Sequence, residues 1–201
     1  MVTRMNPRVI KRRRRAARTP QRIAGITLLE VLTVITIAAV LMALGVPSYQ
    51  YVTNANRISG EVNDLLGDMQ YARSEAIKEG ATVSVCVAAS TSTPTNPACA
   101  VGSTAWQNGW IVFSDVNGDG VFNGQDVVLR AKSAFPLGDT FNANNAMSAV
   151  TFNREGFALG LNNTVTVTLH AAVPVSQTTR CLQITLIGQL TTETAGVLGC
   201  S

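Results

Sequence analysis

The feature that most constrains this chain is an uninterrupted apolar run near its N-terminus. The run extends from Ile26 to Val46 and contains a single ionisable residue, Glu30. A helix rises about 1.5 Å per residue, so a run of this length is just sufficient to cross the hydrocarbon core of a membrane. We therefore expect residues 26–46 to form a membrane-spanning helix.

Glu30 is the anomaly in this run, because a carboxylate in hydrocarbon costs a few kcal/mol and is tolerated mainly when it has a partner or a function. The run contains no Lys, Arg or His that could serve as that partner. The nearest candidate is the α-amine that cleavage after Gly25 would create at Ile26. A helical or extended start holds this amine away from Glu30 of the same chain, so the partner would belong to a neighbouring copy or homologue.

The stretch Arg22-Ile23-Ala24-Gly25-Ile26-Thr27-Leu28-Leu29-Glu30 resembles the cleavage signal of type IV prepilins and type II secretion pseudopilins. In that superfamily a prepilin peptidase cuts after the glycine and methylates the new N-terminal residue. The glutamate five places beyond the cut pairs with the N-terminal amine of an adjacent subunit. The resemblance thus implies cleavage between Gly25 and Ile26, N-methylation of Ile26 and an assembly role for Glu30. The chain departs from the usual pattern at Ile26, where the family usually has Phe.

Positive charge is concentrated ahead of the apolar run. Nine of the 16 Lys and Arg residues precede Ile26 and no acid does, so without residues 1–25 seven bases face 12 acids, a formal charge of −5. Overall charge therefore gives no support to nucleic-acid binding.

Basic residues beside an apolar run keep that end in the cytoplasm and send the remainder outward. A secretory signal peptide fits less well, because the run is long, contains Glu30 and lacks a small-x-small cleavage site before Pro47.

Helical periodicity continues beyond the apolar run. Apolar residues recur at three- and four-residue steps as far as Ile77, and charged residues occupy the other faces. Gly80 supplies a C-terminal stop, and Pro47 predicts a kink near the membrane boundary. We expect one helix from about Thr27 to Glu79, with residues 47–80 forming its amphipathic continuation.

After Gly80 the apolar period changes to two, which is typical of β-strands. A sheet with one apolar face would cover the apolar stripe of the helix. We therefore expect an α+β, pilin-like fold, in which a long N-terminal helix packs on a mostly antiparallel β-sheet domain of residues 81–201. The predicted strands cover residues 82–87, 110–113, 127–130, 149–152, 164–169 and 181–186.

Four cysteines, Cys86, Cys99, Cys181 and Cys200, all follow the apolar run. An even number of cysteines in a translocated domain favours disulfides. Four cysteines allow three pairings, and we favour Cys86 with Cys99 and Cys181 with Cys200, because each of these pairs closes a local loop. A zinc site has little support, since the chain has no Cys-x-x-Cys and one histidine.

Later stretches narrow the resemblance to the GspH/FimT family, which comprises the pseudopilin H of type II secretion and the related minor pilin of type IV pili. The stretches are residues 70–77, 106–113, 152–156 and 180–200. The resemblance implies a minor pseudopilin, anchored in the bacterial inner membrane by a single pass, whose C-terminal domain is periplasmic. The alternative function within this family is that of a type IV pilus minor pilin, which primes fibres or assists DNA uptake. The implied partners are other pilins or pseudopilins, the prepilin peptidase, the inner membrane and a secretion or pilus assembly platform.

The segment from Asp115 to Asp126 has the spacing of a twelve-residue calcium loop. Predicted strands rather than helices flank the segment, and it ends in Asp126 instead of the longer glutamate. A hairpin loop rich in Asn, Asp and Gly explains the same residues. Calcium therefore remains an alternative to a plain turn, and a membrane-anchored periplasmic calcium-binding module remains an alternative function. The calcium ligands would be Asp115, Asn117, Asp119, Val121, Asn123 and Asp126.

DNA binding and catalysis have little support in the sequence. Minor pilins that take part in DNA uptake would carry a Gly-Arg-x-Arg motif near the C-terminus, where this chain has Gly188-Gln189-Leu190-Thr191. His170 is the only histidine, and no nucleophile-elbow, metalloprotease or phosphate-loop motif accompanies it. We expect a protein that is not an enzyme and does not bind DNA strongly.

Overall fold

The structure is a computed structural model that describes residues 25–93, 95–135, 138–172, 178–197 and 200. The chain divides into two compact units, Met1–Ala43 and Leu44–Ser201. Its one long helix, α1 (Leu28–Glu79), precedes all the described strands, which confirms the α+β fold with a long N-terminal helix. A short 3-10 helix, η1 (Trp106–Asn108), follows the first strand.

The strands form two antiparallel sheets, whereas the sequence predicted one. The five-stranded sheet has the order β3-β2-β1-β5-β6 and the four-stranded sheet has the order β4-β7-β8-β9. The first sheet consists of β1 (Val83–Val87), β2 (Gly109–Ser114), β3 (Val127–Ser133), β5 (Ala149–Phe152) and β6 (Ala158–Leu159). The second consists of β4 (Thr140–Ala143), β7 (Val165–His170), β8 (Arg180–Ile184) and β9 (Leu190–Thr194).

All six predicted strands are present, and three further strands were missed. β6 has two residues, and β4 and β9 have four and five. Each of the three pairs with one neighbour and lies at the edge of its sheet. Short edge strands with polar residues carry a weak sequence signal, because pairing rather than propensity stabilises them.

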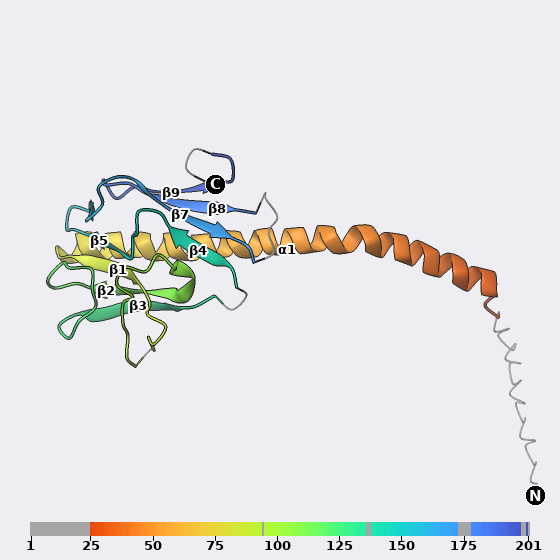
Figure 1. The fold of residues 1–201 in the computed structure, drawn as a ribbon, viewed down its shortest axis with the longest axis horizontal. Coiled ribbons are helices and arrows are strands. Elements are labelled where there is room, and N and C mark those ends of the chain that lie inside the picture. The colour runs from red at the N-terminus through yellow and green to blue at the C-terminus, as the bar shows by residue number, and fades with distance from the viewer. Residues whose placement is uncertain (1–24, 94, 136–137, 173–177, 198–199, 201) are drawn as a thin grey trace, which may run out of the picture. The chain divides into compact units, whose positions relative to one another are not determined.

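The second half of α1 packs on the strands of both sheets (Figure 1). Its buried side chains recur at the predicted three- and four-residue steps, so the apolar stripe is the face that enters the core. The buried apolar residues of the helix are Ile58, Val62, Leu65, Met69, Ala72 and Ala76. They share one core with Trp106 of η1 and with large side chains from both sheets, including Trp110, Phe141 and Phe152.

The helix ends where the sequence predicts. Gly80 has φ +66°, the left-handed conformation that glycine adopts without strain, and the Ala81 N–H donates to the Ala76 carbonyl at 3.3 Å. The helix continues without interruption through Pro47.

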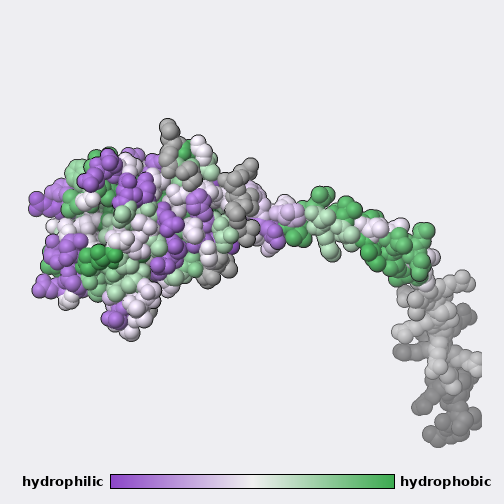
Figure 2. All heavy atoms as spheres, in the orientation of Figure 1, coloured by the Kyte–Doolittle hydropathy of each residue, from purple (hydrophilic) through white to green (hydrophobic). Residues whose placement is uncertain are grey.

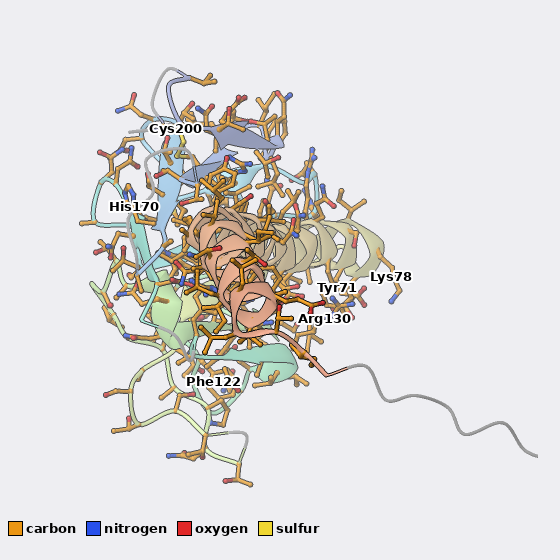
Figure 3. The ribbon with its side chains drawn as sticks, turned by 90° about the vertical axis from the view of Figure 1, so that its right-hand side faces the viewer. Tyr71, Lys78, Phe122, Arg130, His170 and Cys200 are labelled. Carbon is orange, nitrogen blue, oxygen red and sulfur yellow. A yellow bond between two sulfur atoms is a disulfide. The ribbon has the colours of Figure 1, made fainter. Side chains whose placement is uncertain are left out.

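Charged residues on the solvent side of α1 hold the edge strand β3. Asp64 pairs with Lys132 at 2.5 Å, and Asp68 pairs with Arg130 at 2.9 Å. Asp68 also accepts a hydrogen bond from the Trp110 indole at 2.8 Å. The Arg130 guanidinium lies over the Tyr71 ring, 3.7 Å from its centre (Figure 3). The edge of the five-stranded sheet is thus tied to the helix by side chains that sequence periodicity had placed only on an exposed face.

Candidate functional site

The candidate site begins with the three residues that precede α1. Gly25, Ile26 and Thr27 are exposed and outside any helix or strand. Ile26 is 74 % exposed, and a Cβ placed on Gly25 would meet nothing within 4 Å. Nothing in the described fold therefore requires glycine at position 25. Residues 1–24 of the predicted leader lie outside the described residues.

Thr27 caps the helix, and Glu30 is the third residue of its first turn. The Glu30 N–H donates to Thr27 Oγ1 at 3.2 Å, and the Val31 N–H donates to the Thr27 carbonyl at 3.2 Å. Thr-x-x-Glu is the pattern of a capping box. The pattern was readable in the sequence but was not recognised there. It places the Glu30 carboxylate at the positive end of the helix dipole, which favours a negative charge.

The surface around Glu30 is apolar and uncovered. Large aliphatic side chains of the first half of α1 are exposed, from 45 % for Val31 to 86 % for Leu28. Figure 2 shows this half of the helix as a largely hydrophobic surface. Among the described residues, α1 is the one helix long and apolar enough to cross a membrane. The described part of the chain offers the Glu30 carboxylate no ion-pair partner.

The hydroxyl groups in this half-helix differ from Glu30, because the helix itself satisfies them. Thr33 Oγ1 donates to the Glu30 carbonyl and Thr36 Oγ1 donates to the Thr33 carbonyl, both at 2.8 Å. Such back-bonding lets a hydroxyl lie in an apolar environment. The Glu30 carboxylate is therefore the group in this surface that needs an outside partner.

Arg73 joins α1 to the turns of both sheets. Its Nε donates to the Gly156 carbonyl at 2.9 Å, in the β5–β6 turn, and its second guanidinium nitrogen donates to the Ile187 carbonyl at 3.3 Å, in the β8–β9 turn. The two turns touch at Gly188, where an added Cβ would lie 2.0 Å from the Gly156 carbonyl oxygen.

We expect Gly188→Ala to destabilise the protein by about 3 kcal/mol or more, because the new methyl group collides with backbone at φ +72°. Gly160→Ala is the matched control: its φ is +75°, but an added Cβ meets nothing within 4 Å. The control should lose only about 1 kcal/mol, the cost of the left-handed conformation. Thermal unfolding of the full chain in detergent measures both, and equal losses would contradict the close contact.

Both disulfides join the cysteine pairs favoured from the sequence. Cys86 bonds to Cys99, and Cys181 bonds to Cys200, which is labelled in Figure 3. The first bond holds the base of the loop that follows β1. The second joins Cys200, the last described residue, to Cys181 of β8 in the four-stranded sheet.

The carboxylates of the Asp115–Asp126 loop accept hydrogen bonds from the loop backbone and, at Asp115, from Ser84 of β1. Asp115 is fully buried and accepts from the Ser84 hydroxyl and two backbone N–H groups at 2.6 to 2.8 Å. Asp119 accepts from the Val121 N–H at 2.8 Å, and the two oxygens of Asp126 accept from backbone N–H groups at 2.8 and 3.0 Å. Among the described residues, no group of three His, Cys, Asp or Glu side chains could hold a metal ion. This arrangement is that of the plain turn, and calcium binding stays a prediction of the spacing alone.

We expect millimolar calcium to shift the midpoint of thermal unfolding of the full chain by less than about 1 °C relative to EDTA, because an ion that does not bind the folded state cannot stabilise it. A rise of several degrees that Asp119→Ala abolishes would show instead that the loop rearranges to coordinate calcium.

The sequence from the second half of α1 to the β8–β9 turn matches a known protein family. The model of the family described as type II transport protein GspH matches residues 61–188. The chain belongs to the GspH family. The match begins within α1, so the apolar run, Gly25 and Glu30 are observations independent of it.

Solved structures show the same fold in a pilin. The crystal structure of the type IV minor pilin FimU of Pseudomonas aeruginosa is 21 % identical in sequence to this GspH-family chain, with a TM-score of 0.54. The alignment covers 71 % of this chain and 92 % of the FimU chain. A second crystal form of FimU has a TM-score of 0.47 at 20 % identity, over 70 % of this chain and 90 % of that one. No curated protein matches the chain. The likeness to FimU confirms the pilin fold.

GspH-family proteins and pilins are structural proteins, and the histidine and the basic residues that follow Ile26 have contacts within the fold. His170 is exposed, with Nδ1 3.2 Å from the Thr179 hydroxyl. All seven bases that follow Ile26 have a partner within the chain, either a carboxylate or a backbone carbonyl. None of these contacts resembles a catalytic constellation.

Proposed function

We propose that this chain is a minor pseudopilin of a type II secretion system, which assembles through its N-terminal helix into a periplasmic pseudopilus for protein export. One observation carries the proposal: the first turn of an exposed apolar helix presents a carboxylate that has no ion-pair partner among the described residues, shortly after an exposed Gly25–Ile26 bond. Membership of a family described as a type II transport protein supports the secretion role.

The chemistry of assembly follows from the cost of leaving Glu30 unpaired. Cleavage after Gly25 creates an α-amine at Ile26, which the prepilin peptidase methylates without removing its positive charge. A neighbouring subunit brings this amine to Glu30 in an apolar environment, where the pair is weakly screened. The rest of the apolar run offers mainly apolar contacts, so this one ion pair fixes the axial register between neighbouring helices.

The topology of the chain supports an inner-membrane anchor with a periplasmic domain. Basic residues precede the apolar run and retain the N-terminus in the cytoplasm. Both disulfides lie in the domain that follows the run, and such bonds persist in oxidising compartments such as the periplasm. In this account the protein is a substrate of peptidase and methylase chemistry and has no catalytic part itself.

The likeness to FimU favours a second candidate, a minor pilin of a type IV pilus. One experiment separates the two: deletion of the gene, followed by assays of type II protein export and of surface pili in the same cells. We expect export to fail and pili to persist, with export restored by the intact gene. Loss of pili with normal export would assign the protein to the pilus instead.

A further inference from the structure

A charged cluster lies where α1 first becomes buried in the β-domain. Ile58 is the first buried residue of the helix, and Arg57 precedes it. The Arg57 guanidinium donates two hydrogen bonds to Asp139, just ahead of β4, each at 2.8 Å. Asp139 is 2 % exposed and also accepts from the Ala172 N–H at 2.7 Å. The Asp139 carboxylate is therefore fully compensated as an anion.

Glu61, one turn further along α1, has no such compensation. It is 8 % exposed, and its Oε1 is 4.0 Å from Arg57 Nε, which already donates a hydrogen bond to Asp139. No donor among the described residues reaches its Oε2, which is buried. A buried carboxylate with so weak a partner is unfavourable in its charged form.

Few other charges face this cluster. Lys132 on β3 contributes a weaker attraction, and its ammonium is engaged by Asp64 at 2.5 Å. His170 on β7, opposite Thr140, is exposed and contacts Thr179. Burial, the charge of Asp139 and a hydrogen bond to Asp139 together raise the pKa of Glu61 to about 7, against the attraction of Arg57 and Lys132.

We propose that Glu61 and Asp139 form a proton-sensitive clasp between α1 and the β-domain. The neutral Glu61 carboxyl donates its proton in a hydrogen bond to the Asp139 carboxylate. Loss of that proton places two carboxylates against one guanidinium and loosens the helix at its point of entry into the domain.

The direction of the pH dependence follows from the raised pKa. The stability that the Glu61 proton contributes is complete below the ordinary pKa of 4.5 and is lost as the pH rises through about 7. Glu61→Gln keeps the shape of the neutral carboxyl and cannot ionise. We therefore expect this variant to raise the unfolding midpoint of the full chain in detergent by about 3 °C or more at pH 8.5 and to leave it unchanged at pH 5.

Glu79→Gln is the control, because Glu79 is an exposed acid at the end of the same helix. It should shift the midpoint at neither pH. Carbon-13 NMR of Glu carboxyl groups adds a direct test without substitution: one resonance should titrate near pH 7 and be missing from Glu61→Gln. Equal shifts of the Glu61→Gln midpoint at both pH values, or a Glu61 resonance that titrates below about pH 5.5, would overturn the clasp. Neither outcome depends on the role in secretion.

Discussion

Replacing Glu30 with alanine is expected to lower the incorporation of this protein into fibres at least about tenfold while the β-domain stays folded. Without the carboxylate, the α-amine of the neighbouring subunit enters an apolar contact uncompensated, at a cost of a few kcal/mol. Each 1.4 kcal/mol corresponds to a factor of ten in the assembly equilibrium. The ratio of fibre-bound to membrane-bound protein in cells that overproduce the fibre measures the effect.

Glu30→Gln separates charge from shape, because the amide keeps the size of the side chain. If the ion pair matters, the glutamine variant should fail as the alanine variant does. Glu79→Ala, which removes an exposed acid at the far end of α1, should incorporate normally. Intact disulfides in each variant would show that the domain has folded. Unchanged incorporation of Glu30→Ala would count against the assembly mechanism.

Replacing Gly25 with tryptophan is expected to leave the leader attached to nearly all of the protein. The described fold places nothing within 4 Å of a Cβ at this position, so a loss of processing would report on recognition by the peptidase rather than on folding. Gly25→Ala, with one added methyl group, should be processed in part. N-terminal sequencing of the membrane protein distinguishes the two forms.

The control for this experiment is Gly45→Ala, a glycine inside α1 whose added Cβ also meets nothing within 4 Å. Its leader should be removed as in the unaltered protein. Normal trimming of Gly25→Trp would refute the assigned cleavage site.

Sequence periodicity predicted the helix and the main strands because their signals are local. The apolar stripe of α1 repeats every three or four residues, β1 and β7 have apolar residues at every second position, and β2 is a short apolar segment. The division into two sheets is not local, since β1 pairs with both β2 and the distant β5. Only the folded chain shows which partner each strand selects.

The same distinction holds for the candidate site. Gly25, Ile26 and Glu30 were recognisable because their spacing along the chain carries the pattern. The contacts of Arg73 with Gly156 and Ile187 span 83 and 114 residues, so no linear pattern could reveal them. In the Asp115–Asp126 loop the sequence showed how many oxygen-bearing side chains are present. The orientation of each carboxylate depends on which backbone N–H groups donate to it, and the sequence does not show this.

The most direct test of the assembly account is the mass and N-terminal residue of the protein isolated from bacterial membranes. The account predicts a chain that begins at Ile26 and carries one methyl group on its α-amine. An intact precursor as the only species, in cells that trim their other prepilins, would contradict it.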